Sequence, residues 1–245
     1  MAYDETVTGI VLSATPIGEY DKRVVLLTRE RGKITAFARG ARRPGNMLMA
    51  PTSPFAFGEF SVYKGKNSYS LSKADIKEYF RSLSLDYEKT CFGFYFLEVC
   101  EYFGLEGQDE TNLITLLYVA VKALERGAVD RRLIKAVFEF KCLYLNGTYP
   151  DVFKCASCGA EERLVLMSTA DSCVYCDECA RESRNLGVFL SPACMYALRY
   201  IIESPANRLF SFELEESARD ELVRTVGKFF YRYTEHKFKS EEFLI

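Results

Sequence analysis

The sequence of 245 residues predicts an α+β fold, in which a small five-stranded β-barrel precedes a helical domain with a cysteine-rich insertion. Three observations predict this order. Short segments rich in Val, Ile, Thr, Phe and Tyr, separated by turn residues, occupy residues 6–80. Helical periodicity replaces them after residue 80, and five of the nine cysteines then lie between residues 155 and 179.

Five β-strands are expected before residue 80. Glycines in two short turns, at residues 30–32 and 64–67, favour a hairpin at each, because glycine readily takes the positive φ that such turns need. The longer connection at residues 40–54 contains three prolines, which exclude a regular helix or strand. A five-stranded barrel with one long connection is typical of an OB-fold. The expected strands are residues 7–14, 23–29, 33–39, 55–63 and 68–75.

Helices are expected in the rest of the chain. Residues 87–103, 112–126 and 130–145 have helical periodicity, and a glycine that can end a helix follows each of them. The pattern returns at residues 191–204, where Ser191 can cap the helix and Pro192 fits its first position, and at residues 215–236. We therefore predict an OB-fold domain over residues 1–80 and a helical domain over residues 81–245, with an insertion at about residues 149–190.

Two pairs of cysteines carry the most specific signal in the sequence. Cys155 and Cys158 form the first pair, Cys176 and Cys179 form the second, and 17 residues lie between the two pairs. One tight turn presents both sulfurs of such a pair to the same ion, so two pairs make a tetrahedral site of four thiolates. This spacing is typical of a zinc ribbon. Four protein ligands leave no open coordination position, so we expect the zinc to be structural.

A fifth cysteine offers an alternative second pair. Cys173 and Cys176 also have two residues between them, and they could replace Cys176 and Cys179. We favour Cys176 and Cys179 because the other choice leaves Cys179 without a role. Buried free cysteines or a redox pair explain the doubled motif less well. Four further cysteines lie among apolar neighbours and are expected to be small buried side chains: Cys91, Cys100, Cys142 and Cys194.

Basic residues concentrate near the start of the chain, although the formal net charge is only −2. Residues 1–80 contain 12 Lys and Arg against 8 Asp and Glu, whereas residues 81–245 contain 20 against 26. Eight cations in residues 22–43 are opposed only by Glu30. A local basic patch favours a polyanion such as nucleic acid, and the alternative is a solvated sheet face that keeps the protein soluble.

The connection after residue 39 contains the best candidates for phosphate contacts. Arg39 leads into it and Arg42 and Arg43 lie within it, where the loop gives an arginine no core to pack against. Aromatic residues are interleaved with the cations, and unpaired bases stack on such rings in OB-folds. Phe37 is the candidate on a strand, although a core role is the alternative for it. Tyr63 and Tyr69 flank a second basic turn, which contains Lys64 and Lys66.

Enzyme signatures are absent from the sequence. The only histidine is His236, which excludes a HExxH metal site and disfavours a catalytic triad. The Gly-Lys pairs at residues 32–33 and 65–66 lack the upstream glycine and the following Ser or Thr of a P-loop. Apolar stretches are too short to cross a bilayer, and acids replace the basic start of a secretory signal at residues 1–5. We therefore expect a non-enzymatic protein of the cytoplasm with no membrane partner.

Taken in order, these features resemble the RecO family of DNA repair mediators from the bacterial RecF recombination pathway. The resemblance rests on residues 19–28 (EYDKRVVLLT), on Gly32 with Lys33, and on residues 38–43 (ARGARR). It continues at the two cysteine pairs, with Ala180 after the last cysteine, and so covers almost the whole chain. Two departures are visible. Cys173 stands where similar proteins have glycine, and residues 45–49 are less basic than in many family members, which implies weaker DNA binding by this loop.

The resemblance implies a mediator that binds single- and double-stranded DNA and anneals complementary strands. It implies RecR and single-strand-binding protein as partners, and RecA indirectly, because such mediators help RecA to load on coated strands. It also implies association with the nucleoid. The basic surface of the family's OB-fold maps onto Lys22, Arg23, Arg39, Arg42 and Arg43, to which we add Lys64 and Lys66.

Two other classes of function remain open from the residues alone. An OB-fold joined to a zinc ribbon is also suited to an RNA-binding adaptor, which would prefer structured RNA to single-stranded DNA. A nuclease or a thiol oxidoreductase is the third possibility, and it would show turnover with magnesium and DNA or reversible oxidation of thiols that hold no zinc. Carboxylates are scattered through the sequence, so no metal-nuclease cluster supports it.

Overall fold

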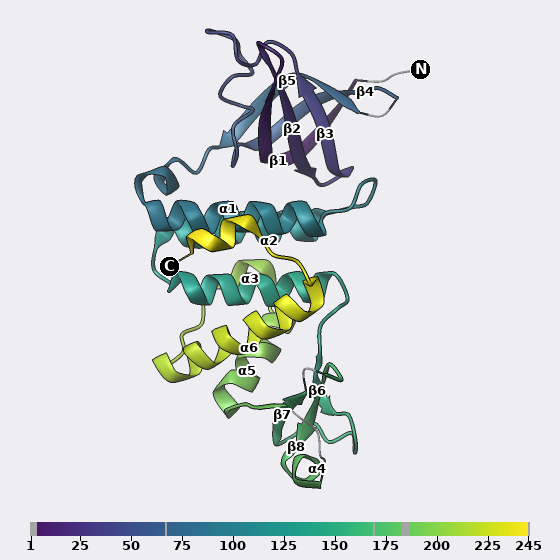
Figure 1. The fold of residues 1–245 in the computed structure, drawn as a ribbon, viewed down its shortest axis with the longest axis vertical. Helices are drawn as coiled ribbons and strands as arrows, with labels where there is room; N and C mark the ends of the chain where they lie inside the picture. The colour runs from purple at the N-terminus through teal and green to yellow at the C-terminus, as the bar shows by residue number, and fades with distance from the viewer. Residues whose placement is uncertain (1–3, 67, 169, 183–186, 245) are drawn as a thin grey trace. The chain divides into compact units, whose positions relative to one another are not determined.

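A computed structural model describes residues 4–66, 68–168, 170–182 and 187–244 of the chain (Figure 1). Position 169 and residues 183–186 of the predicted insertion therefore lie outside the described residues. The chain forms two compact units, which are described in turn. The first comprises Met1–Glu125 and Phe238–Ile245, and the second comprises Arg126–Lys237. The boundaries of these units differ from those of the domains predicted from the sequence, residues 1–80 and 81–245. Those domains stay a prediction.

A closed five-stranded barrel begins the first unit and confirms the predicted fold class (Figure 1). Its strand order is β1-β2-β3-β5-β4, with β3 and β5 parallel and the other neighbours antiparallel. Each strand overlaps the segment expected from the sequence. The strands are β1 (Asp4–Ile17), β2 (Asp21–Thr28), β3 (Gly32–Ala38), β4 (Phe57–Lys64) and β5 (Tyr69–Glu78).

The barrel core forms because apolar residues alternate along the strands. In β3, Ile34 and Ala36 are buried inside, whereas Phe37 is only half-buried. Ala36 pairs with Val24 in β2, and the next pair in the register, Phe37 with Arg23, therefore faces outward. The fully buried Phe60 lies in the same cluster. This alternation leaves the ends of β2 and β3 free to present polar and charged side chains.

Two helices and the C-terminal segment complete the first unit. Helix α1 (Tyr87–Phe103) has the predicted bounds, and α2 is Thr111–Arg126. Asp86 begins α1 by accepting a hydrogen bond from the backbone N–H of Lys89 at 3.1 Å. A short 3-10 helix, η1 (Arg81–Leu85), connects the barrel to α1, and another, η3 (Lys239–Phe243), ends the chain.

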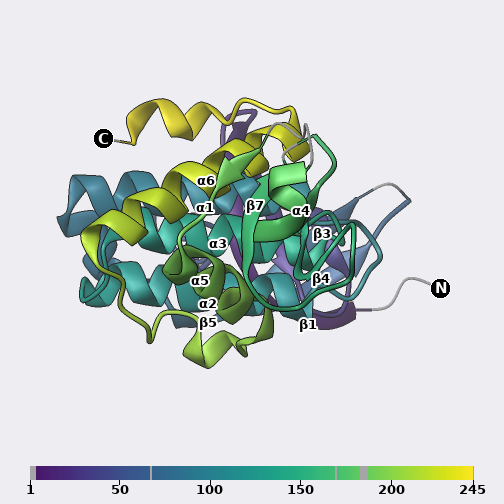
Figure 2. The same ribbon diagram turned by 90° about the horizontal axis from the view of Figure 1, so that it is seen from below.

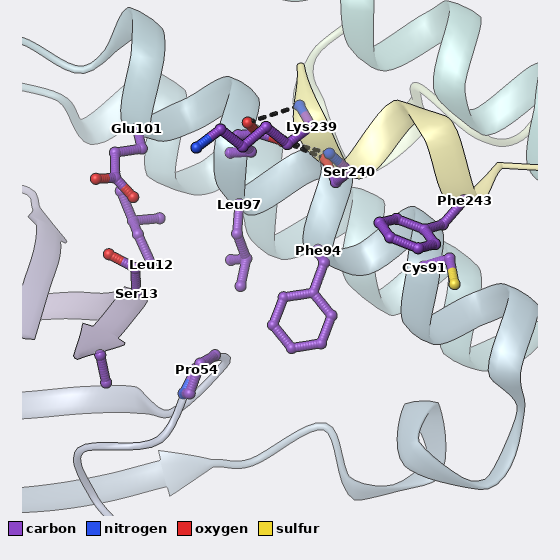
Figure 3. Close-up of a pocket in the computed structure, with 12 residues that line it drawn as sticks. Leu12, Ser13, Pro54, Cys91, Phe94, Leu97, Glu101, Lys239, Ser240 and Phe243 are labelled. Carbon is purple, nitrogen blue, oxygen red and sulfur yellow. Dashed lines mark hydrogen bonds between the residues drawn. The ribbon is translucent and has the colours of Figure 1, made fainter. Parts of the chain in front are cut away.

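The C-terminal segment lies against α1 (Figure 3). The Glu98 carboxylate accepts hydrogen bonds from the backbone N–H groups of Lys239 and Ser240, both at 2.9 Å. The ring of Phe238 meets that of Tyr95 edge to face at 5.7 Å. Beside this contact lies an apolar cavity of about 510 Å³, which Phe94 and residues of β1 and η3 help to line.

Three longer helices form the body of the second unit: α3 (Arg131–Leu145), α5 (Pro192–Glu203) and α6 (Glu216–Thr234). The predicted cap of α5 is confirmed, because the Ser191 hydroxyl accepts from the Cys194 N–H at 3.2 Å and Pro192 is the first helical residue. Helix α6 ends two residues earlier than predicted, since Glu235 takes a left-handed conformation with φ of 46°. Among the described residues, no helix has both the length and the apolar character needed to cross a membrane.

The predicted insertion folds as a small sheet between α3 and α5. Its strand order is β6-β8-β7-β9. Helix α4 lies against β7 and β8 (Figure 1), and Figure 2 shows α4 beside β7. The elements are β6 (Asp151–Cys155), β7 (Leu164–Ser168), β8 (Cys173–Cys176), α4 (Asp177–Glu182) and β9 (Val188–Phe189). Val152, Met167 and Val174 of this sheet are fully buried, and the cysteine cluster lies within the insertion.

Candidate metal centre and nucleic-acid interface

Four cysteine sulfurs from three elements of the insertion converge. Cys155 ends β6, Cys158 follows in the next turn, Cys176 ends β8, and Cys179 lies in α4. All four sulfur atoms lie within 4.8 Å of one another. The sulfurs of Cys158 and Cys176 are 3.7 Å apart, which is much longer than a disulfide bond of about 2.05 Å.

This spacing suits a tetrahedral zinc ion. With Zn–S bonds of about 2.3 Å, the sulfurs of a four-thiolate site lie about 3.8 Å apart. Burial alone would raise the pKa of the Cys155 thiol, but hydrogen bonds from the backbone N–H groups of Cys158, Cys176 and Ser157 outweigh it and lower this pKa to about 6. The thiolate is the form that binds metal. Contacts with the sulfurs of Cys158 and Cys176 in turn raise the pKa of Cys179 to about 12, because neighbouring thiolates repel one another when no cation lies between them. The four sulfurs and their spacing therefore fit the expected ion.

Cys173 lies outside this cluster of four cysteines, because β8 is a strand. Side chains of successive strand residues point to opposite faces, so Cys173 and Cys176, three residues apart, face opposite ways. The Cys173 sulfur instead acts as an acceptor beside the Tyr175 hydroxyl and, together with burial, raises the pKa of that hydroxyl to about 12. The alternative pair of Cys173 and Cys176 does not share one turn, which is the geometry that the CxxC spacing requires.

The other four cysteines lie on helices. Cys100, Cys142 and Cys194 are buried, as expected for small apolar side chains, and burial raises the pKa values of the Cys100 and Cys194 thiols. Cys91 differs because it is half-buried and lines the apolar cavity beside Phe243 (Figure 3).

Two loops of the barrel meet where the predicted DNA-binding arginines lie. The turn between β1 and β2 is joined to the connection between β3 and β4 through Arg42. Its backbone N–H donates to the Tyr20 carbonyl at 2.8 Å, and its guanidinium Nη1 donates to the Glu19 carbonyl at 3.1 Å. The Gly40 N–H also donates to the Asp21 carboxylate at 2.7 Å. Arg42 therefore holds the two loops together in addition to presenting charge at the surface.

Arg43, the next residue, is exposed and stacks on an aromatic ring. Its guanidinium carbon lies 4.8 Å from the centre of the Tyr20 ring. The sequence did not single out Tyr20 as an aromatic contact, because the partner residues are 23 positions apart and only the closed barrel brings their loops together. A tyrosine in a turn beside basic residues was the available signal.

Lys22 has a supporting role in the same region. Its ammonium donates to the Met49 carbonyl at 3.1 Å and to the Thr52 hydroxyl at 3.0 Å. Burial and the nearby charge of Arg42 lower the pKa of Lys22. These bonds hold the connection between β3 and β4 to β2, so Lys22 is less available to a ligand than the sequence suggested.

Arg23 and Arg39 are the exposed cations that flank this junction. Arg23 lies on the outer face of β2, opposite the half-buried Phe37 of β3. Arg39 directly follows β3. Both therefore border the surface that carries Arg42 and Arg43.

The second basic turn, between β4 and β5, also has exposed cations. Lys64 and Lys66 are exposed, and Tyr63 is 43% exposed, whereas Tyr69 packs partly against the barrel core. Asn67 of this predicted turn lies outside the described residues. A polar cleft of about 300 Å³ lies beside Lys64, and the cations Arg31 and Lys33, which the sequence did not single out for DNA contact, also line it.

These two additional cations of the cleft, Arg31 and Lys33, are already bonded. Arg31 pairs with the Glu5 carboxylate at 2.8 Å, and the Lys33 ammonium donates to the Glu101 carbonyl at 2.6 Å. The seven predicted cations thus fall into two groups on the barrel. One surrounds the junction of the two loops, and the other occupies the turn between β4 and β5.

Comparison with known proteins covers almost the whole chain. The family model described as "Recombination protein O N terminal" matches residues 1–80, and that described as "Recombination protein O C terminal" matches residues 84–242. A DNA repair protein RecO from Acetivibrio thermocellus is 29% identical over 238 residues, which cover 97% of this chain and 94% of the relative. The protein of the same name from Bacillus subtilis is 28% identical over 236 residues, covering 96% and 92%.

Proposed function

Because the chain belongs to the recombination protein O family, a family of DNA repair proteins, we propose that it acts as a non-enzymatic recombination mediator. In this role it binds single- and double-stranded DNA, anneals complementary strands, and helps RecA to load on strands coated with single-strand-binding protein. RecR and single-strand-binding protein are its proposed protein partners. Such a protein works at the nucleoid in the cytoplasm.

The observation that carries the proposal is the group of exposed arginines around the junction of the two barrel loops. Arg39, Arg42 and Arg43 lie within five residues of the chain, and the bonds of Arg42 fix the loop that bears them. A preformed cationic surface binds phosphates without losing the conformational entropy of a free loop. It is therefore suited to a DNA backbone of any sequence.

Annealing by such a surface needs no catalytic residue. Two DNA strands repel each other through their phosphates, and bound arginines reduce this repulsion while they release condensed counterions. Strand pairing itself supplies the free energy. The proposal therefore assigns no catalytic residue to the chain, and it predicts that salt weakens both DNA binding and annealing.

Zinc has a structural place in the proposal. Cys155, Cys158, Cys176 and Cys179 would hold one zinc ion, which keeps the small sheet of the insertion folded. With four protein thiolates as ligands, the ion takes no part in binding or chemistry. The net negative charge of residues 81–245 is better suited to protein partners than to DNA.

A salt series of DNA binding tests the proposed surface. We expect Arg39→Ala to weaken binding several-fold and to reduce the slope of log affinity against log salt by about 1. Lys77→Ala is the matched control. It also removes one positive charge, but from the C-terminal end of β5, where Lys77 pairs with Glu59. Equal losses in the two variants would contradict a DNA site at this surface.

A further inference from the structure

Tyr20 has a special place on the proposed DNA surface because its backbone is held and its ring is accessible. The Tyr20 carbonyl accepts from the Arg42 N–H, and Arg42 also bonds to the carbonyl of the preceding residue, Glu19. The residue nevertheless remains 38% exposed. A ring on a held turn loses little freedom when it contacts a ligand, so it provides a contact surface at low entropic cost.

The guanidinium of Arg43 lies over one face of the Tyr20 ring and adds a second planar group to it. The guanidinium carbon lies 4.8 Å from the ring centre, and a guanidinium is a planar group that stacks as rings do. Nucleic-acid bases stack on aromatic side chains and on arginine planes alike. A hydrogen bond to Glu19 raises the pKa of the Tyr20 hydroxyl.

The aromatic residues singled out from the sequence are less suited to this task. Phe37 is half-buried beside Arg23, and Tyr69 packs partly on the barrel core. Tyr63 is exposed, but it lies with the second group of cations at the turn between β4 and β5. Tyr20 alone among these four rings is stacked with an arginine of the proposed phosphate-binding loop.

We propose that the stacked pair of Tyr20 and Arg43 is a base platform, on which one unpaired base of a single DNA strand stacks while neighbouring arginines bind phosphates. This inference rests on the proposed function and adds a specificity to it. Bases in a duplex are covered by their neighbours, so the platform contributes to single-strand binding and not to duplex binding. Through this platform, one basic surface distinguishes single-stranded from double-stranded DNA.

Binding of three oligonucleotides by three forms of the full chain tests the platform. The DNAs are an oligothymidine, an abasic strand of the same length, and a duplex. The proteins are the wild type, Tyr20→Ala, and Tyr20→Phe as the matched control that keeps the ring and loses the hydroxyl. Tyr20→Ala should weaken oligothymidine binding about fivefold or more, and Tyr20→Phe should bind almost as the wild type does.

The abasic strand separates stacking from a change in the loops. The wild type should bind the abasic strand as weakly as Tyr20→Ala binds oligothymidine. Tyr20→Ala should bind the abasic strand no more weakly than it binds oligothymidine. Duplex binding should stay within about twofold in all three proteins, because phosphate contacts dominate it. Equal loss on all three DNAs, or no loss on oligothymidine, would overturn the platform. Failure of the wild type to bind any DNA would overturn the proposed function itself.

Discussion

The sulfur of Cys158 lies 3.7 Å from the sulfur of Cys176, although 18 positions separate the two residues in the chain. One belongs to the turn after β6 and the other ends β8, so the fold of the insertion brings the two cysteine pairs together. Without an ion, four thiols at this distance stabilise little, and their thiolate forms repel one another. If the cluster holds its expected zinc ion, metal binding and folding of the insertion should therefore be coupled.

Substitution of one ligand should release the metal. We expect the wild type to contain one zinc per chain and Cys176→Ser to contain much less, because three thiolates bind zinc more weakly than four. Cys173→Ser is the matched control and should retain the full content, since Cys173 faces away from the cluster. Metal analysis of the purified proteins measures both. Full zinc in Cys176→Ser, or loss in Cys173→Ser, would show that the ligand set is wrong.

A methyl group at Gly32 should destabilise the first unit strongly. Gly32 has φ of +63°, and a Cβ atom there would lie 2.0 Å from the Leu105 carbonyl oxygen. We expect Gly32→Ala to lower the free energy of unfolding by about 2 kcal/mol or more. Gly18→Ala is the control, since Gly18 also has positive φ but nothing within 4 Å, and should cost about 1 kcal/mol. Urea unfolding compares the two, and similar losses would refute the predicted clash.

The ion pair of Glu78 and Lys122 should make stability depend on pH. Their side chains are 2.7 Å apart, and the hydrogen bond from Lys122 lowers the pKa of Glu78 below 4.5 in spite of partial burial. A lowered carboxyl pKa stabilises the folded state above about pH 4.5, and this contribution is lost as the pH falls through the folded-state value.

Glu78→Gln removes this titration. We expect it to lower the free energy of unfolding by about 1 kcal/mol at pH 7, a modest value because both side chains are partly exposed. The difference from the wild type should vanish below the folded-state pKa, where Glu78 is itself neutral. Urea unfolding across this pH range measures it, and a difference that persists at low pH would exclude the ion pair as its cause.

Lys141 should stabilise the end of α5 in the second unit. Its buried ammonium donates to the carbonyls of Ile201, Ile202 and Ser204 at 3.0, 2.7 and 3.1 Å. Lys141→Met fills similar space but leaves these acceptors without the donor, so we expect a loss of about 2 kcal/mol in urea unfolding. Lys154→Met, at an exposed ion pair, should change stability by less than about 0.5 kcal/mol. Comparable effects would mean that the Lys141 bonds contribute little.

Local sequence signals predicted the fold because each strand pattern and each helix cap depends on only a few neighbouring residues. Period-two alternation located the five strands, and caps such as Ser191 located the helices to within a few residues. Strand β4 begins later than predicted, at Phe57, because Phe55 has φ of 71° and cannot continue a strand. A phenylalanine gives no sequence signal for positive φ, since packing imposes that conformation.

The candidate site was only partly predictable because its details depend on contacts between distant segments. The cysteine spacing identified the four converging residues, but only the strand geometry of β8 separates Cys173 from Cys179. Similarly, a run of cations does not show which of them serve the fold. Lys22 and Arg42 bond to carbonyls of other loops and so also serve the fold, and only the closed barrel brings those loops within reach.

Annealing of two complementary oligonucleotides, one coated with single-strand-binding protein, tests the central proposal most directly. Fluorescence quenching follows strand pairing with and without the zinc-loaded protein across a salt series. We predict that the protein accelerates annealing at low salt, that the acceleration fades as salt rises, and that Arg39→Ala reduces it more than Lys77→Ala does. Absence of any acceleration by the folded protein at low salt would contradict the proposed mediator function.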